Sequence, residues 1–188
     1  MILTTERLIL RPWKESDAGS LYEYAKDERI GPAAGWPAHT SIGNSREIIR
    51  DVLSAPDTYA VCLKEDGRAI GSAGLMTGKH SNIGLPDNEA EIGYWIGVPF
   101  WGRGLIPEAV SELIRYAFED LRLDALWCGY FEGNDKSRRV QEKCGFTYHH
   151  TNENAPWKKM NDIRTEHISR LTRDSWIKGK RKNSGREI

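Results

Sequence analysis

The sequence predicts an α/β (α+β) fold, in which helices flank a mixed β-sheet. Short runs of apolar residues with a period of two recur along the chain, and these runs indicate strands. Between them lie stretches whose apolar residues repeat every 3.6 positions, which indicates helices. The 188 residues are enough for one domain with a sizeable core. We expect a single domain over residues 1–172 and a basic C-terminal tail over 173–188.

The first third of the chain predicts a strand, two helices and a loop. Residues 3–11 alternate as a strand, and Ser16 or Asp17 can cap the helix that follows. The Pro- and Gly-rich stretch 31–39 indicates a loop, and a second helix is expected over 41–54. The apolar faces comprise Ala18, Leu21, Tyr22 and Ala25 in the first helix, and Ile48, Ile49, Val52 and Leu53 in the second.

The middle of the chain predicts the centre of the sheet. Strands are expected over 59–64 and 69–75, and a polar loop over 76–88 leads into a central strand over 89–98. The helix after this strand has a well-defined pattern. Its apolar stripe comprises Ala109, Val110, Leu113, Ile114, Ala117, Phe118 and Leu121.

The last third predicts another strand over 124–131 and a short helix over 134–144. Gly145 suits the left-handed position that ends a helix, with Phe146 anchoring the turn. Two further strands close the sheet, and a polar, basic and partly disordered tail follows. These strands are expected over 147–152 and 163–172, and the tail over 173–188.

Composition and charge exclude several classes of protein. Basic and acidic residues both number 27, so no net charge favours nucleic acid. No apolar run reaches the roughly 18 residues of a membrane span, and a strand pattern starts too early for a signal peptide. Cys62, Cys128 and Cys144 lie far apart without a CxxC motif, which predicts reduced core thiols. We expect a cytoplasmic protein without a metal.

The most informative segment runs from 90 to 109 and reads AEIGYWIGVPFWGRGLIPEA. It predicts a buried strand, a break at Pro99, a glycine-rich turn and the start of a helix. Glycines let the backbone approach a ligand, and the first amides of a helix can hold a phosphate group. A simple loop cap is the alternative. The expected pyrophosphate site comprises Trp101, Gly102, Arg103, Gly104, Leu105 and Ile106, with Arg103 adding charge.

Two other phosphate-binding motifs do not fit this turn. A P-loop needs Lys and then Ser or Thr after its last glycine, whereas Leu105 and Ile106 follow Gly104. A Rossmann fingerprint needs a third glycine, and Ile106 and Pro107 occupy its place. A nucleotide-binding protein of either class is therefore not supported.

Three ordered blocks resemble the GNAT superfamily of acyl-coenzyme A N-acetyltransferases, and in particular its RimJ/RimL-like branch. The resemblance covers residues 3–172, which is nearly the whole chain. The third block is similar to the branch's N-x-x-S and E-K-x-G-F signature. The blocks are the opening strand Thr5 to Pro12, the strand end 96–99 with the turn 101–104, and Asn134, Ser137, Val140 and Glu142 to Phe146.

Two positions depart from the family pattern. Ile106 replaces a residue that is usually small, and Pro107 replaces one that is often Thr. Proline suits the first helical position, where we expect Pro107 to lie. A hydroxyl contact to phosphate is lost at this position.

The resemblance implies a mostly antiparallel sheet with a splayed central strand pair, and acetyl-CoA as co-substrate without a metal. The pantetheine arm would pair with backbone near Ile96 and Val98. Gly97 would form the bulge that splays the strands, and its amide or that of Val98 would stabilise the oxyanion. Asn134 and Ser137 would contact the coenzyme. Close packing at Gly97 and helix capping by Asn134 and Ser137 are the structural alternatives.

Glu91 is the expected catalytic base. At neutral pH, deprotonation costs about 1.4 kcal/mol for an α-amino group and about 4.6 kcal/mol for a lysine, and a nearby carboxylate offsets this cost. Glu91 shares a strand face with Gly93, Trp95 and Gly97, where a charge needs a cavity or a partner. At a strand end it could instead be solvated or paired with an arginine. Glu89 is a weaker candidate.

Ser137 is the expected hydrogen-bond donor to the departing thiolate, and the tyrosines of the central strands are alternative acids. Aromatic residues on core strands more often serve packing, and a loop histidine is more often a surface residue. The alternative acids are Tyr94 and Tyr130, and the acceptor-binding residues are expected to be Trp36, His39, His80 and Tyr94.

The residues and the resemblance together predict an N-acetyltransferase, an acyltransferase that moves an acetyl group from acetyl-CoA to a primary amine. We expect direct attack in a ternary complex, with a small molecule or a protein N-terminal α-amine as acceptor. A non-catalytic acyl-CoA-binding sensor is the alternative, since the turn could bind coenzyme without a usable base. No membrane or specific nucleic-acid partner is expected, and the protein should be a monomer or a homodimer.

Overall fold

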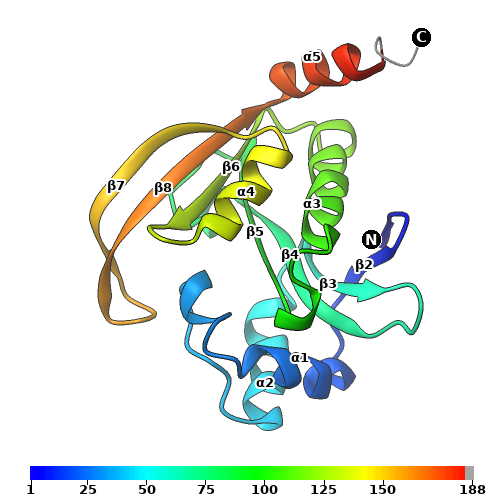
Figure 1. Cartoon of the computed structure of the whole chain (residues 1–188), viewed down its shortest axis with the longest axis vertical. Helices are drawn as coiled ribbons and strands as arrows, with labels where there is room; N and C mark the ends of the chain where they lie inside the picture. Colours follow the sequence, from blue (N-terminus) through cyan, green and yellow to red (C-terminus); the bar gives the residue numbers. More distant parts are fainter. Residues whose placement is uncertain (185–188) are drawn as a thin grey trace.

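The computed structural model describes residues 1–184, which form an eight-stranded sheet flanked by helices (Figure 1). The strand order is β1-β2-β3-β4-β5-β6-β8-β7. The strands are β1 Leu3–Thr4, β2 Leu8–Pro12, β3 Thr58–Leu63, β4 Ala69–Thr77, β5 Glu89–Ile96, β6 Ala125–Phe131, β7 Thr147–Trp157 and β8 Asp162–Thr172. The helices are α1 Ala18–Ala25, α2 Ile42–Ile48, α3 Leu105–Arg115, α4 Asp135–Lys143 and α5 Arg173–Ser184.

The two central strands of the sheet pair only at one end. β5 and β6 are the parallel pair of this otherwise antiparallel sheet. They pair from Glu89 opposite Ala125 to Glu91 opposite Trp127, and beyond this point they separate (Figure 1). β6 continues against β8 instead. The mostly antiparallel sheet with a splayed central pair is therefore confirmed.

The two faces of β5 carry different side chains, because successive strand residues point to opposite faces. Ile92 and Ile96 are buried in the larger core, which includes the apolar stripe expected after this strand except for the exposed Leu121. Trp95 points the other way and packs against Trp36, with ring centroids 5.7 Å apart. Glu91 shares the face of Trp95, as the period of two predicts.

The opening strand expected over 3–11 is a hairpin instead. β1 and β2 pair antiparallel, with Leu3 opposite Leu10. Thr5 closes the turn, because its amide donates to the Leu8 carbonyl and its hydroxyl accepts from the Leu8 amide. Residues 4–7 are all polar, and the chain reverses within this polar break, which the prediction of one strand passed over.

Gly97 does not form the expected bulge. β5 ends at Ile96, β4 and β5 pair without a register shift, and Gly97 precedes the 3-10 turn Val98–Phe100. A Cβ at Gly97 would lie 2.7 Å from the Tyr24 ring. Close packing, the structural alternative, therefore explains this glycine.

Two helices end in wider π-helical turns, at 49–53 after α2 and at 116–120 after α3. The change of pitch rotates the residues that follow. Val52, which was expected in the core, is consequently 53% exposed, while Ile49 is buried. The left-handed Gly145 after α4 matches the expectation.

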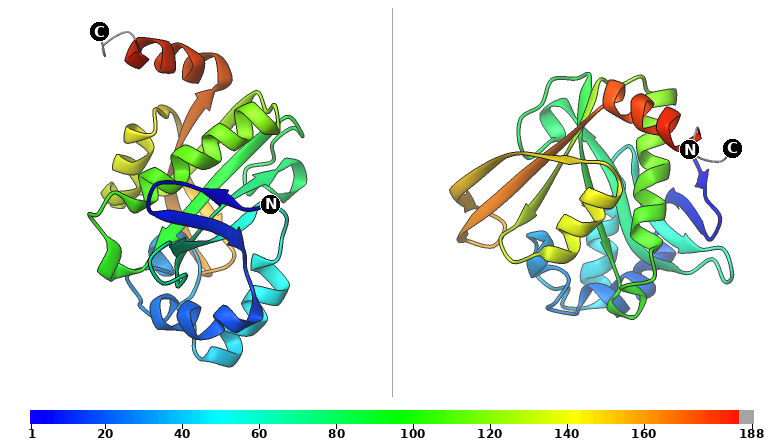
Figure 2. Two further views of the ribbon diagram at one scale, coloured as in Figure 1. Left: turned by 90° about the vertical axis from the view of Figure 1, so that its right-hand side faces the viewer. Right: turned by 45° about the horizontal axis from the view of Figure 1, so that its top comes forward.

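The C-terminal segment is helical as far as Ser184, and the part of the expected tail at 185–188 lies outside the described residues. Arg173 donates to Asp124 at 2.6 Å, and the Trp176 ring lies 5.4 Å from that of Phe118. These contacts attach the start of α5 to the domain, and Figure 2 shows the helix projecting from the end of β8. Over residues 1–184, no helix has the length and apolarity to cross a membrane.

Candidate functional site

The turn between β5 and α3 has the geometry of an anion-binding turn. Gly102 and Gly104 have φ angles of 75° and 74°, a region that favours glycine. α3 starts at Leu105 with Gly104 as its N-cap, so the amides of Leu105 and Ile106 have no partner inside the helix. Residues 102–104 are exposed. The turn therefore offers main-chain donors to a ligand.

Pro107 is the third residue of α3, not the first as expected. The difference arises because the helix begins directly after Gly104, two residues before the proline. The third amide of a helix also lacks an internal acceptor, so proline costs no helical hydrogen bond there.

The β1–β2 hairpin holds the start of α3, beside which it lies in Figure 2. Glu108 accepts hydrogen bonds from the Thr5 hydroxyl at 2.5 Å, the Arg7 amide at 2.8 Å and Arg7 Nε at 2.7 Å. Arg7 also donates to the Arg103 carbonyl at 3.0 Å. Burial opposes ionisation of Glu108, but the donors of Thr5 and Arg7 outweigh it and lower its pKa. The first and second sequence blocks thus form one structural unit.

Trp101 connects the turn to β5 and to α4. Its indole N–H donates to the Ile96 carbonyl at 3.0 Å, and the Lys136 ammonium lies 3.9 Å from the ring centre. Arg103 lies over the Phe100 ring at 5.6 Å. Lys136 and Arg103 are both exposed, so one cation lies within the glycine turn and a second lies beside it. Lys136 was not identified from the sequence.

Beyond Glu91, one edge of β5 faces away from any paired strand of the described sheet. The Gly97 amide donates to the Ile70 carbonyl at 2.8 Å, which shows that alternate main-chain groups of β5 point toward β4. The main-chain groups of Ile92, Tyr94 and Ile96 point toward the gap where β6 separates from β5. Since the Gly97 amide is already bonded, Val98 remains as the expected oxyanion donor.

Tyr94 and Ser137 meet across the gap on the α4 face. The Tyr94 hydroxyl lies 3.0 Å from Ser137 Oγ and 3.1 Å from the Ser137 carbonyl. Gln141 Nε2 donates to the Gly129 carbonyl at 3.1 Å and lies 3.4 Å from Ser137 Oγ. Burial raises the pKa of Tyr94 well above its ordinary value, so its hydroxyl stays protonated. Tyr94 therefore lies with Ser137, on the face opposite to Trp36.

Asn134 caps α4, as its position predicts. Its side-chain oxygen accepts from the Ser137 amide at 3.2 Å, and its amide donates to the Ala33 carbonyl at 3.2 Å. The capping role is thus present, and a contact between Asn134 and the coenzyme stays a prediction. Tyr130 packs against His167, with ring centroids 4.9 Å apart.

Glu91 is buried on the opposite face, at 7% exposure. Its carboxylate accepts from the Asn82 amide at 2.7 Å, from Asn82 Nδ2 at 3.1 Å and from the Ser81 hydroxyl at 3.1 Å. Glu91 is neither solvated nor paired with an arginine. The glutamate of β5 that pairs with an arginine is Glu89, which lies 3.1 Å from Arg170.

A second buried carboxylate, Glu166 on β8, was not identified from the sequence. It lies over Gly129, where a Cβ would collide with its Oε1. Burial and the charge of Glu91 outweigh a hydrogen bond from Asn152 and raise the pKa of Glu166 to about 7. The signal was present, because Glu166 interrupts a strand pattern just as Glu91 does.

A cavity of about 370 Å³ opens on this face, between the loop after β4 and the β7–β8 hairpin. Its apolar wall includes two tryptophans, and its polar groups include Glu166 and Asn82. The lining residues are Asn82, Ile83, Leu85, Trp127, His150, Asn152, Ala155, Pro156, Trp157 and Glu166.

The residues expected to bind the acceptor are only partly brought together. Trp36 packs on Trp95, and the Trp157 indole, which lines the cavity, donates to the Gly35 carbonyl at 2.6 Å. His39 is bonded to the Ser45 hydroxyl at 2.8 Å, and burial lowers its pKa. His80 is exposed and does not line the cavity. The loop 31–39 therefore supports the wall of the cavity without lining it.

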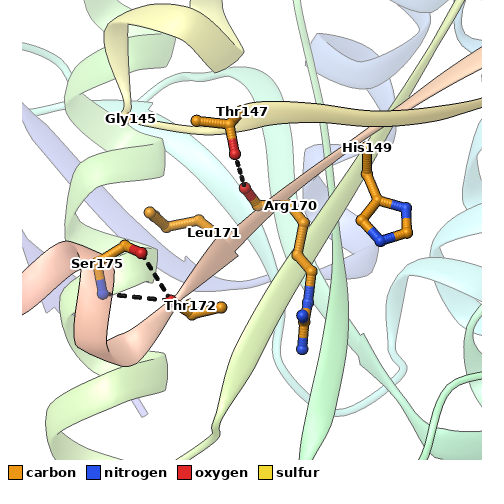
Figure 3. A pocket seen from close by; sticks show the side chains of 7 residues that line it. All are labelled: Gly145, Thr147, His149, Arg170, Leu171, Thr172 and Ser175. Atoms are coloured by element: carbon orange, nitrogen blue, oxygen red, sulfur yellow. Dashed lines mark hydrogen bonds between the residues drawn. The ribbon is translucent and has the colours of Figure 1, made fainter.

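A smaller cavity of about 210 Å³ lies between β7, β8 and the start of α5 (Figure 3). Figure 3 shows Thr147 donating to the Arg170 carbonyl and Ser175 bonded to Thr172. Neither Glu91 nor Glu166 lines this smaller cavity. Among residues 1–184, no group of three or more His, Cys, Asp or Glu side chains could hold a metal ion.

Comparison with known proteins agrees with this geometry. The family described as "Acetyltransferase (GNAT) domain" matches residues 7–147. "Uncharacterized N-acetyltransferase p20" of Bacillus licheniformis is 30% identical over 129 residues, which are 66% of this chain and 70% of that protein. YdaF of Bacillus subtilis (strain 168), a proposed ribosomal N-acetyltransferase, is 46% identical over 65 residues, 35% of this chain and 36% of YdaF.

Solved structures share the fold. The microcin C7 self-immunity acetyltransferase MccE, in complex with acetyl-CoA and AMP, has a TM-score of 0.73 at 21% identity, over 89% of this chain and 93% of that chain. The likeness to ribosomal acetyltransferases agrees with the RimJ/RimL-like signature. Because the family match spans most of the sequence, this chain belongs to the GNAT family of acetyltransferases.

Proposed function

We propose that this acetyltransferase transfers the acetyl group of acetyl-CoA to a primary amine by direct attack in a ternary complex. The amine is that of a small molecule or of a protein N-terminus. One observation carries the proposal. Where β5 and β6 part, the partly buried hydroxyls of Tyr94 and Ser137 lie on one face of the sheet and two buried carboxylates on the other.

The coenzyme fits the turn before α3, because left-handed glycines and unpaired helix amides are available to a diphosphate there. The main-chain edge of β5 near Ile96 and Val98 would hold the pantetheine arm, and Lys136 and Arg103 would add positive charge. When bound, acetyl-CoA supplies a thioester whose sulfur leaves as a thiolate. The proposed contacts to the coenzyme are Ile96, Gly97, Val98, Trp101, Gly102, Arg103, Gly104, Leu105, Ile106, Asn134 and Ser137.

The two faces of the gap would supply opposite chemistry. The hydroxyls of Ser137 and Tyr94 can donate to a developing thiolate, which is a tolerable leaving group with a pKa near ~8.5. Glu91 favours the free amine on the other face, directly or through another group. Cys128 is buried and its pKa is raised, so it is a poor nucleophile for an acetyl-enzyme route.

Two measurements test the proposal. The purified protein should melt at a higher temperature with acetyl-CoA, and it should release thiol when peptides with free N-termini, polyamines or aminoglycosides are added. Absence of both responses would refute the proposal. Coenzyme binding without turnover on any of these amines would support the acyl-CoA sensor instead.

A further inference from the structure

Of the two buried carboxylates, only Glu166 lines the 370 Å³ cavity. Glu91 does not line the cavity. Asn82 lines it instead and donates to both oxygens of the Glu91 carboxylate. Ser81 adds a further donor to Glu91. A molecule in the cavity would therefore meet Glu166, while Glu91 is occupied by the loop.

The position of Glu166 relative to the gap follows from the strand register. Glu166 lies opposite Phe131 and Ile168 lies opposite Gly129, so all four share one face of the sheet. The Glu166 carboxylate crosses over Gly129, toward the edge where β6 leaves β5. Only a glycine at 129 leaves room for it.

Gly129 links Glu166 to the hydroxyl cluster on the other face. Its carbonyl accepts from Gln141, which also contacts Ser137 Oγ, while its Cα borders the Glu166 carboxylate. One residue of main chain thus separates the proposed thiolate donor from a carboxylate facing the cavity. A thioester held in the gap would be reached from the Glu166 side by an amine and from the Ser137 side by a hydroxyl.

We propose, on the basis of the proposed function, that Glu166 takes the proton from the acceptor's ammonium group and that Glu91 acts through Glu166. The acceptor enters the cavity as a primary ammonium, and one proton passes to Glu166 and then to water. The free nitrogen attacks the thioester carbon, the C–S bond breaks, and the remaining proton that nitrogen loses leaves with sulfur as the thiol. Amide, thiol and one released proton balance the reaction.

The charges around Glu166 agree with this role. Burial and the negative charge of Glu91 place its pKa near neutrality, where a carboxylate is an effective base. The other charged or titratable groups of this face include His150 of β7, which lines the cavity, and His149, which packs on Trp127. Glu89 of β5 and Arg164 and Arg170 of β8 lie on this face as well. Arg164 stacks on Phe131 and pairs with Asp162, and Arg170 pairs with Glu89, so both are engaged elsewhere.

The test uses the full chain, acetyl-CoA and the amine that gives the highest turnover in the panel above. Glu166→Gln should lower kcat by about 10²–10⁴-fold and leave the affinity for acetyl-CoA unchanged. In the unsubstituted protein, kcat should rise with pH through about 7. Glu91→Gln should keep measurable activity and move this rise to lower pH, because it removes the charge that disfavours ionised Glu166.

The matched control is Glu132→Gln, an exposed glutamate just after β6, which should leave kcat and its pH dependence unchanged. If the unsubstituted protein turns over amines but Glu166→Gln retains the same kcat and pH profile, this assignment is wrong while the proposed function stands. If no amine reacts at all, the proposed function fails first. The melting temperature between pH 4 and 9, without ligands, checks independently that Glu166 titrates near neutrality.

Discussion

The two faces of the sheet at the β5–β6 gap differ in their polar groups. On the α4 face these are the hydroxyls of Tyr94 and Ser137 and the amide of Gln141, which carry no charge at neutral pH. On the opposite face they are the carboxylates of Glu91 and Glu166. A leaving thiolate needs hydrogen-bond donors and an incoming ammonium needs a proton acceptor. Under the proposed function, the thiolate would leave on the α4 face and the amine would arrive on the opposite face.

The anion-binding turn should be the most sensitive element, and breaking it should leave both faces intact. Gly104→Val forces a β-branched residue into left-handed backbone at φ 74° and displaces the first amides of α3. We expect the affinity for acetyl-CoA, measured by calorimetry, to fall by at least about 10²-fold, since hydrogen bonds to a charged group contribute about 1.5–3 kcal/mol each.

Gly67→Val is the matched control for the turn. Gly67 has a φ of 71°, lies in the β3–β4 turn and has open space around it. The same backbone strain should lower stability there without changing coenzyme affinity. Equal affinities for the two variants would show that the turn before α3 is only a loop cap.

The buried Glu166 carboxylate should lower the stability of the folded protein by an amount that depends on pH. The pKa of Glu166 is about 7 in the folded protein against 4.5 for an ordinary glutamate, so stability is full below pH 4.5 and falls as pH rises to 7. The neutral Glu166→Gln avoids this loss and should be more stable by roughly 1–3 kcal/mol above pH 7. Denaturant unfolding at pH 4 and pH 8 measures it, and an equal difference at both values would contradict the pKa.

The hydroxyl face should contribute mainly to the chemical step. Ser137→Ala removes a donor to the thiolate and should lower kcat by about 10- to 10²-fold, as for a hydrogen bond to a charged group. Tyr94→Phe removes the hydroxyl bonded to Ser137 and should have a smaller effect. Single-turnover thiol release measures both variants. Unchanged rates with either substitution would mean that this cluster only holds β5 against α4.

A smaller effect on kcat is expected from a substitution at Gly129, which lies between the two faces. Gly129→Ala should push the Glu166 carboxylate away from the gap and lower kcat about tenfold, because a displaced catalytic group loses part of its general-base contribution. Coenzyme affinity should not change. Gly19→Ala on α1, where a Cβ meets no other atom within 4 Å, is the control. If Gly129→Ala and Gly19→Ala lowered kcat equally, Glu166 would have no role in the reaction.

Much of the fold could be predicted from local patterns. The stripe of α3, the Asn134 cap and the left-handed Gly145 each depend on residues within a few positions of one another. Prediction from periodicity failed in two places. The prediction of one strand over 3–11 passed over the polar break at residues 4–7, where the chain reverses, and the π-turn at 49–53 rotates Val52 out of the core.

The candidate site divides in the same way. The sequence by itself determined the glycine turn, the helix that follows it and a carboxylate within the central strand, because each is encoded by neighbouring residues. Only the tertiary structure decided that Asn82 covers Glu91, that Gly97 packs on Tyr24, and that Glu166 crosses Gly129 toward the gap. The reason is physical: these contacts join residues far apart in the chain, and strand order and register bring them together.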